Sequence, residues 1–550
     1  MKRVLVASAV AALALVTFFQ FPGHTWLQQD SQIYVPILEH LRDPSVLAND
    51  MLVGGHYLAF TLYDEAAELL RTLTGLGFRE VLGAAQLATR GLGIWGLYLM
   101  ATAAGLAAAP ALVASSVVSL GAMTLGPQVL TFEYEPTPRG LALPLVLCAV
   151  GLVSHRRYLA AGLAAAAGFL IHPPTACPYW VLYLFLALLA SEPRTSRRRR
   201  YGLLPLAGAA LALLVAARYQ AGEGESQDLF STLTALQVKL QLMRTAYVRV
   251  SVWGPALAAH YAVIVVLLAG AYLRIQRRLS PALRFFVVGL PAIGLASVPV
   301  SYLLLERAGW ALIPQFQPLR ALLFVVLMMQ FTTAVAAVAA GWERRWAEAF
   351  FWFAAAYSLP LVGRLDALPP WRAGLTLILL ALLGTVALLL RERRGGAVAL
   401  AAAALAGFWL APSLGAVVNY PRLLTPELAE LSRWANASTP KPALFLFADA
   451  PRSLEPGVFR VQALRPVYVD WKGGGQINYL KDFGERWWLR WQQTLGAGFR
   501  PADLPRYDAL GIGFVVLQPR NRLEARQPLF ENARYLVYRA AAGSGPDARP

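Results

Sequence analysis

A group of acidic side chains follows the first apolar run of this 550-residue chain. The stretch HTWLQQDSQIYVPILEHLRDPSVLANDMLVGG, residues 24–55, contains Asp30, Glu39, Asp43 and Asp50. A carboxylate held where water meets lipid can act as a general base, because it can accept a proton from a bound hydroxyl group. Acids in a long loop more often keep that loop solvated, which is our interpretation of Glu39. Asp30, at the exit of the run, is the first candidate for catalysis.

A second acidic segment, GPQVLTFEYEPTPRGLALPL at residues 126–145, carries Glu133 and Glu135 shortly before Arg139. Carboxylates from two loops could hold a divalent cation, because hard cations prefer oxygen ligands. Alternatively, the acids divide into a base and a partner of Arg139, or Glu135 only pairs with that arginine. The segment makes Glu135 the second catalytic candidate and leaves a divalent cation open as a cofactor.

Three basic side chains occupy positions where apolar residues would be less costly. Arg90 lies about 13 Å into the second predicted span, so it should face a partner or a wet cavity. His172, in FLIHPPTACPYW, and Arg320, in PQFQPLRALL, are predicted at outer helix ends beside prolines. Arginine recognises phosphate in bidentate fashion, but arginines at helix ends also serve as snorkelling anchors. All three are candidate substrate-binding residues.

Membrane-spanning helices must position these residues. The composition is 57% hydrophobic and 15% charged, with a mean hydropathy of +0.50, which does not suit a soluble enzyme. Apolar runs that can cross about 30 Å of hydrocarbon predict about thirteen spans. They occupy residues 4–21, 81–107, 109–125, 139–154, 158–171, 176–190, 202–218, 254–273, 284–305, 319–340, 347–363, 372–390 and 396–413.

The first two predicted spans are separated by a long connection, residues 22–80, which we call the first outer loop. Within it, IYVPILEHL and LYDEAAELLRTL have the apolar spacing of short amphipathic helices that lie along a membrane surface. Long loops of this kind usually carry function.

Positive charge alternates along the predicted connections and indicates the orientation. With Lys2 and Arg3 inside, every second connection is arginine-rich, for example at Arg197–Arg200. Lysine and arginine collect on the cytoplasmic side of membranes. The net charge of +18 therefore reflects topology and does not indicate nucleic acid. We predict a plasma (inner) membrane protein with a cytoplasmic N-terminus and an extracytoplasmic C-terminal domain.

The composition becomes polar after the last predicted span, so residues 1–413 form the multi-span part and residues 414–540 a small α/β domain. Short stretches rich in Val, Phe and Tyr predict its strands. They are residues 443–449, 459–471, 512–518 and 533–540. The Gly-, Pro- and Ala-rich tail, residues 541–550, is predicted to be disordered.

Taken together, the inside N-terminus, the first outer loop opening with Asp30 in DSQIY, the many spans and the external domain resemble the GT-C superfamily of polytopic membrane glycosyltransferases. The resemblance covers the whole chain in architecture. TPKPALFLF, RPVYVDWKGGG and ENARYLVYRA further resemble the outer domains of uncharacterised bacterial GT-C-like membrane proteins.

The resemblance implies an all-α polytopic fold of about thirteen helices with a small extracytoplasmic α/β domain. It also implies sugar transfer from a polyprenyl-phosphate donor, with a carboxylate near the start of the first outer loop as the base. Asp30 matches that position. The family commonly has Asp-Glu there, whereas Ser31 follows Asp30 here.

The site predicted for such an enzyme contains Asp30 and Glu135 as catalytic residues. Its predicted substrate-binding residues are Tyr34, Arg90, Glu133, Arg139, His172 and Arg320. The predicted partners are a lipid-linked sugar donor and membrane lipids. Two alternatives stay open. One is a transporter or flippase of a lipid-linked substrate, which should show internal repeats. The other is a non-catalytic membrane protein that binds the cell envelope through residues 414–550.

Overall fold

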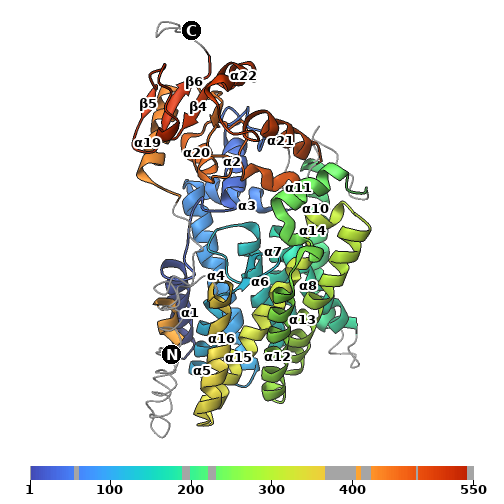
Figure 1. Ribbon diagram of the computed structural model, residues 1–550. Helices are drawn as coiled ribbons and strands as arrows, with labels where there is room; N and C mark the ends of the chain where they lie inside the picture. The colour runs from blue at the N-terminus through green and yellow to red at the C-terminus, as the bar shows by residue number, and fades with distance from the viewer. Residues whose placement is uncertain are drawn as a thin grey trace.

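The computed structural model describes residues 2–54, 61–188, 198–220, 231–365, 404–409, 423–478 and 481–541. A helical bundle carries the C-terminal domain on one end (Figure 1). Helices α2 (Ser31–Arg42) and α3 (Tyr63–Thr74) of the first outer loop lie between the two parts. The acidic loop singled out in the sequence is therefore placed at the junction of bundle and domain.

The bundle is built around helix α15, Leu323–Trp342, which is buried throughout Leu323 to Gly341 because it is apolar on every side. Helix α15 packs mainly against α5 (Ala108–Ser119), α12 (Pro255–Ile275), α13 (Pro281–Ser301) and α16 (Trp346–Leu365). The other bundle helices are α1 (Lys2–Phe19), α4 (Phe78–Ala103), α6 (Pro138–Ser154), α7 (Tyr158–Ile171), α8 (Pro173–Leu188) and α10 (Leu204–Gln220).

Shorter helical segments connect these helices near the C-terminal domain. They are α11 (Ala235–Thr245), η1 (Ala246–Val248), η2 (Val250–Val252), η3 (Tyr302–Arg307), α14 (Leu312–Phe316) and η4 (Pro318–Leu322).

Four helices of the described part are long and apolar enough to cross a membrane, and five further apolar helices are shorter. The four are Arg198–Arg218, Pro255–Ile275, Pro281–Arg307 and Leu312–Trp342. In the last, 94% of the most apolar window is buried in protein, against 17–33% in the other three, so the last is central and the others expose apolar faces. The predicted count of about thirteen spans is not confirmed. The predicted spans 372–390 and 396–413 lie outside the described residues, apart from a helix at 404–409.

The helix at the predicted span 109–125 is shorter than expected, because α5 ends at Ser119. Gly121 adopts φ +73°, and a Cβ there would lie 3.1 Å from Cβ of Phe132. Glycine adopts this left-handed conformation more readily than other residues, and a residue in this conformation ends the helix. A hairpin of β1 (Met123–Thr124) and β2 (Val129–Leu130) follows and leads into the segment with Glu133 and Glu135.

The two amphipathic helices predicted in the first outer loop are present as α2 (Ser31–Arg42) and α3 (Tyr63–Thr74). α2 buries the apolar side of IYVPIL, including Val35 and Leu38. α3 keeps leucines such as Leu69 and Leu73 exposed. Helix α2 is thus fixed by packing, which makes it a rigid support for the residue at its start.

The C-terminal domain contains a four-stranded sheet in the order β3-β4-β6-β5. β3 is parallel to β4, and β6 is antiparallel to both β4 and β5. The strands are β3 (Phe445–Phe447), β4 (Phe514–Leu517), β5 (Phe530–Glu531) and β6 (Leu536–Arg539). The helical elements are α19 (Pro426–Ser438), α20 (Glu455–Ala463), η5 (Gly473–Asn478), α21 (Lys481–Thr494), η6 (Pro501–Asp503), α22 (Leu504–Ala509) and η7 (Pro519–Asn521).

Three of the four predicted strand regions contain β3, β4 and β6, but the strand predicted at 459–471 is wrong. Its first part belongs to α20, in which Pro456 stands in the first turn, where its missing N–H is not needed. Phe459 and Ala463, one turn apart, are buried on the same side. Only Val467 pairs with the sheet, as a single bridge to Phe445. The predicted tail 541–550 lies outside the described residues except for Ala541.

Candidate functional site

The segment that carries Asp30 is held in place by Glu135. Oε1 of Glu135 accepts hydrogen bonds from the N–H groups of Gln28 (2.6 Å) and Gln29 (2.8 Å) and from the hydroxyl of Ser31 (2.9 Å). Its Oε2 accepts one from the Ser31 N–H at 3.1 Å. A carboxylate at the start of α2 satisfies N–H groups that the helix itself cannot bond and interacts favourably with its dipole.

Glu135 is 1% exposed, and both of its oxygens are engaged by this segment. Burial raises the pKa of Glu135, and the charge of Asp30 adds to this, while hydrogen bonds from Ser31 and Gln29 oppose it. The geometry gives Glu135 a positioning role, and its predicted catalytic role stays a prediction. Four protein hydrogen bonds already reach these oxygens, and a divalent cation at this carboxylate stays a prediction. Within the described ranges, no three His, Cys, Asp or Glu side chains form a metal-binding group.

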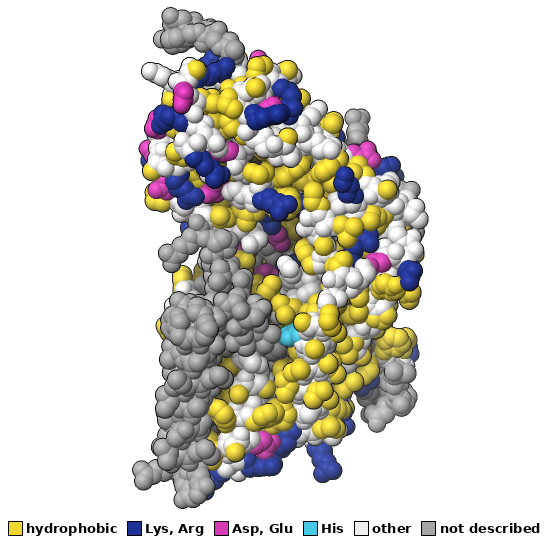
Figure 2. Space-filling view, in the orientation of Figure 1, with side chains coloured by type: hydrophobic (Ala, Val, Ile, Leu, Met, Phe, Trp, Pro, Cys, Tyr) yellow, Lys and Arg dark blue, Asp and Glu magenta, His cyan; other side chains and the backbone are white. Residues whose placement is uncertain are grey.

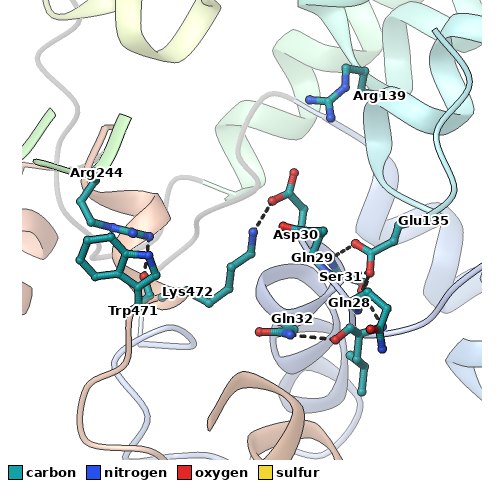
Figure 3. A network of polar contacts seen from close by, with 12 residues as sticks. Gln28, Gln29, Asp30, Ser31, Gln32, Glu135, Arg139, Arg244, Trp471 and Lys472 are labelled. Carbon is teal, nitrogen blue, oxygen red and sulfur yellow. Dashed lines mark hydrogen bonds and ion pairs between the residues drawn. The ribbon is translucent and has the colours of Figure 1, made fainter. Parts of the chain in front are cut away.

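Asp30 is the accessible carboxylate of this pair, with a side chain that is 37% exposed. Its Oδ1 accepts a hydrogen bond from Nζ of Lys472, at 2.6 Å, and Lys472 comes from the C-terminal domain (Figure 3). Burial opposes ionisation of Asp30, but Lys472, Arg139 and Arg320 outweigh it and hold the pKa of the carboxyl well below its usual range. Asp30 is therefore a carboxylate, able to accept a hydrogen bond or a proton.

Arg139 points toward the space beside Asp30 from the first turn of α6 (Figure 3). The hydroxyl of Thr137 caps this helix by accepting the Gly140 N–H at 3.2 Å. Nε and Nη2 of Arg139 both contact Oε1 of Glu133, at 2.8 and 2.7 Å. The predicted pairing of Arg139 with an acid of its own loop is thus present, but the acid is Glu133.

His172 and Arg320 belong to the same charged surroundings. His172 lies between α7 and α8, and its Nδ1 is 2.9 Å from the hydroxyl of Thr175. Burial, followed by the charges of Arg320 and Arg139, lowers the pKa of His172, so its imidazole is neutral. The same two arginines act on Asp30. Nε of Arg320 is buried and has no hydrogen-bond partner among the described residues.

The surface is hollowed between the C-terminal domain and the bundle, with acidic side chains visible inside (Figure 2). Lys472 connects these two parts at Asp30. The structure thus brings together Asp30, Arg139, His172 and Arg320 from the predicted set and adds Lys472. A negatively charged carboxylate surrounded by several cations is an arrangement that can bind an anionic ligand beside a base.

Tyr34, also predicted to bind substrate, lies one turn after Asp30 on α2. Its ring centroid is 5.7 Å from that of Tyr63, which donates a hydrogen bond to the carbonyl of Pro136 at 2.7 Å. Tyr34 therefore borders the segment that Glu135 fixes, and its role toward substrate stays a prediction.

Arg90 has a structural environment. It is 2% exposed, and it donates hydrogen bonds to the carbonyls of Thr17 (2.6 Å), Gly23 (3.0 Å) and Glu133 (2.6 Å). Its guanidinium also lies 5.8 Å from the ring centroid of Phe18. Arg90 joins the end of α1 to the segment before α6. This geometry favours a structural role over the predicted contact with substrate in a wet cavity.

A buried group of charges that we did not predict joins the first outer loop to the C-terminal domain. Nε of Arg460 contacts Oδ2 of Asp50, and Nη2 contacts Oδ1 of Asp470, each at 2.6 Å. The Asp50 and Arg460 side chains are 0% exposed and that of Asp470 is 2% exposed. We call Asp50, Arg460 and Asp470 the buried triad. The only sequence signal for it was an acid in an apolar setting at position 50, in ANDMLVGG.

No family model and no curated protein sequence matches the chain. Similar solved structures exist. ArnT from Cupriavidus metallidurans has a TM-score of 0.48 and 14% identity, over 98% of each chain. Arabinofuranosyltransferase AftD from Mycobacteria has a TM-score of 0.49 and 16% identity, over 99% of this chain and 42% of that chain. An oligosaccharyltransferase from Archaeoglobus fulgidus has a TM-score of 0.40 and 10% identity, over 94% of this chain and 69% of that chain.

These likenesses assign neither a substrate nor a residue role to this chain.

Proposed function

We propose that this protein is a membrane glycosyltransferase that moves a sugar from a polyprenyl-phosphate donor to an acceptor at the outer face of the membrane. One observation carries the proposal. Asp30 presents an accessible carboxylate on a segment fixed by Glu135, with Lys472, Arg139 and Arg320 around it. This is a base placed beside a group of cations that suits a phosphate.

The reaction begins at the acceptor. Asp30 takes the proton of an acceptor hydroxyl group while the hydroxyl oxygen attacks the anomeric carbon of the sugar. The bond from that carbon to the phosphate oxygen breaks, and the polyprenyl phosphate leaves with the electron pair. Arg139 and Arg320 stabilise the negative charge that develops on the leaving phosphate. The products are the glycosylated acceptor, the lipid phosphate and protonated Asp30.

We expect inversion at the anomeric carbon, because Asp30 is the partly exposed carboxylate of the Asp30–Glu135 pair. Glu135 is engaged at both oxygens by residues 28–31, so Asp30 is the carboxylate left to act. A single base supports one displacement at the anomeric carbon, which inverts its configuration. A two-step reaction with retention would need a carboxylate free to form a covalent intermediate and another to act as acid and base.

A lipid-linked donor suits the composition and the location of the site. The sequence has no Gly-rich phosphate loop of the kind that holds nucleotides. The described helices include four that could cross a membrane, and the site lies at the end of the bundle that carries the C-terminal domain. A lipid in the bilayer can present its head group there.

Turnover of defined donors tests the proposal. The purified full-length protein is incubated with polyprenyl-phosphate sugars and hydroxyl-bearing envelope acceptors, and released polyprenyl phosphate and the anomeric configuration of the product are measured. Transfer with inversion would support the proposal. Movement of intact donor across vesicles without bond cleavage would replace it with the transporter alternative, and binding of acceptor without either would favour the envelope-binding protein.

A further inference from the structure

The backbone before Lys472 is held in place by contacts from two parts of the molecule. Asp470 belongs to the buried triad, and its carbonyl accepts a hydrogen bond from Nε1 of Trp487 at 3.0 Å. The Trp471 ring lies against Arg244 of α11, whose Cζ is 3.6 Å from the ring centroid. Nη2 of Arg244 also donates to the Trp471 carbonyl at 2.5 Å. The two residues before Lys472 are therefore held by both the C-terminal domain and the bundle.

The glycines that follow Lys472 allow the backbone to lie close to the side chains of Trp487 and Asp470. A Cβ at Gly474 would lie 2.6 Å from the Trp487 ring, and one at Gly473 would lie 2.7 Å from Oδ1 of Asp470. A side chain at either position would force its neighbours to move. The segment WKGGG thus delivers one lysine side chain to the junction between domain and bundle.

The side chain of Lys472 is mostly buried, at 12% exposed, and its partner is the carboxylate that reaches the surface. Its ammonium group is a compact cation on a flexible stem, and at Asp30 it borders a carboxylate that is 37% exposed. Arg320, with its buried and unpartnered Nε, acts on the same carboxylate from η4. Glu133 partly neutralises Arg139, and Asp30 partly neutralises Lys472. An entering phosphate would add the negative charge that this group of cations can still accept.

We propose that Lys472 is a donor-binding residue contributed by the C-terminal domain, and that its ammonium group leaves Asp30 for the phosphate when the donor enters. The inference rests on the proposed function, because it assumes that the anion is the phosphate of a lipid-linked donor. It makes the C-terminal domain a part of the site.

The exchange has a consequence for the base. The charged groups that act on Asp30 are Lys472 before η5, Arg139 on α6, Arg320 on η4 and the carboxyl group of Glu135. Removing the nearest cation raises the pKa of Asp30 toward its usual range, and the phosphate charge raises it further. A carboxylate with a higher pKa is the stronger base, so Asp30 becomes a better proton acceptor only once the donor is bound.

Binding of farnesyl phosphate and of farnesol, which lacks the phosphate, separates the lysine's contribution from that of the lipid chain. Both are measured by calorimetry on the full-length protein without sugar or acceptor. We expect Lys472→Met to weaken farnesyl phosphate binding about 10- to 100-fold, as for loss of a hydrogen bond to a charged group, and to leave farnesol binding unchanged. Lys472→Arg should restore most of the affinity. Lys441→Met is the control, because Lys441 pairs with Asp43 at the surface, at 3.3 Å.

The exchange itself is tested by Asp30→Asn. This variant removes the competitor for Lys472, so it should bind farnesyl phosphate more tightly than the wild type. Unchanged affinity in Lys472→Met, or weaker binding in Asp30→Asn, would overturn the inference, and Asp30→Asn still decides if Lys472→Met does not fold. Lysine-dependent phosphate binding without any sugar transfer would contradict the proposed function alone. Sugar transfer with no effect of Lys472 would contradict this inference alone.

Discussion

At the scale of single residues, two buried or half-buried carboxylates that look alike in the sequence have different environments. Glu135 accepts hydrogen bonds at both oxygens from residues 28–31, whereas Asp30 contacts one lysine and stays partly exposed. Desolvation and hydrogen bonding decide which carboxylate can meet a substrate. The candidate base is therefore defined by what surrounds it, and we expect Glu135 to act by positioning Asp30.

Arg90 allows a direct test of a residue's structural role. Arg90→Leu leaves the carbonyls of Thr17, Gly23 and Glu133 without this donor in a buried region. The carbonyls of Thr17 and Glu133 keep hydrogen bonds from the Gly23 N–H and the Gln86 side chain. We expect a loss of about 1–3 kcal/mol in the free energy of unfolding, the cost of leaving the buried Gly23 carbonyl unpaired. Thermal unfolding in detergent measures this, with Arg79→Gln, at an exposed site on the same helix, as the control. An Arg90→Leu protein that melts like the wild type but fails to bind donor would contradict the structural role.

At the scale of elements, the periodicity of the sequence predicted helices α2 and α3 and the regions of β3, β4 and β6, because these depend on local apolar spacing. The strand predicted at residues 459–471 was wrong. The packing of α20 against the domain outweighed the strand preference of its Val and Phe residues. The position of Asp30 was predicted, but its partner Lys472 was not. They are 442 residues apart, and WKGGG indicates by itself only a turn. The buried triad was missed for the same reason.

The buried triad predicts how strongly the C-terminal domain is attached. Arg460→Met would leave Asp50 and Asp470 without their shared cation in a buried site. Breaking a buried ion pair in this way typically costs about 3–5 kcal/mol. We expect a lower melting temperature and faster limited proteolysis between bundle and domain. Arg433→Met, at an exposed position of α19, should change neither, and an equally stable Arg460→Met protein would show that the triad does not hold the domain.

At the scale of the whole molecule, the placement of charged side chains bears on which end of the bundle faces the cytoplasm. Lys and Arg side chains lie over the C-terminal domain and also at the end of the bundle opposite that domain (Figure 2). On the connections there, Arg274 contacts Glu343 at 2.6 Å and Glu348 at 2.5 Å, and Arg278 also contacts Glu343. Because arginine-rich connections collect in the cytoplasm, we expect the C-terminal domain and Asp30 to lie outside.

Cysteine labelling tests this orientation. In a variant with Cys148 and Cys177 replaced by alanine, single cysteines are placed at Glu524, exposed in the C-terminal domain, and at Arg198, exposed at the start of a membrane-crossing helix. We expect a membrane-impermeant maleimide to label position 524 in intact spheroplasts and position 198 only after lysis. The opposite pattern would place the candidate site in the cytoplasm and remove the argument for a lipid-linked donor.

The central claim is that Asp30 is the base of a sugar transfer, and it is tested most directly by the turnover of two matched variants. Asp30→Asn keeps the shape of the side chain and removes its charge, so turnover should fall about 10²- to 10⁴-fold. Asp43→Asn changes an acid of the same loop that also pairs with a lysine of the C-terminal domain, but at the surface. Its turnover should stay within about twofold of the wild type, as for most surface substitutions. Equal turnover of the two variants, under conditions where the wild type transfers sugar, would contradict the claim.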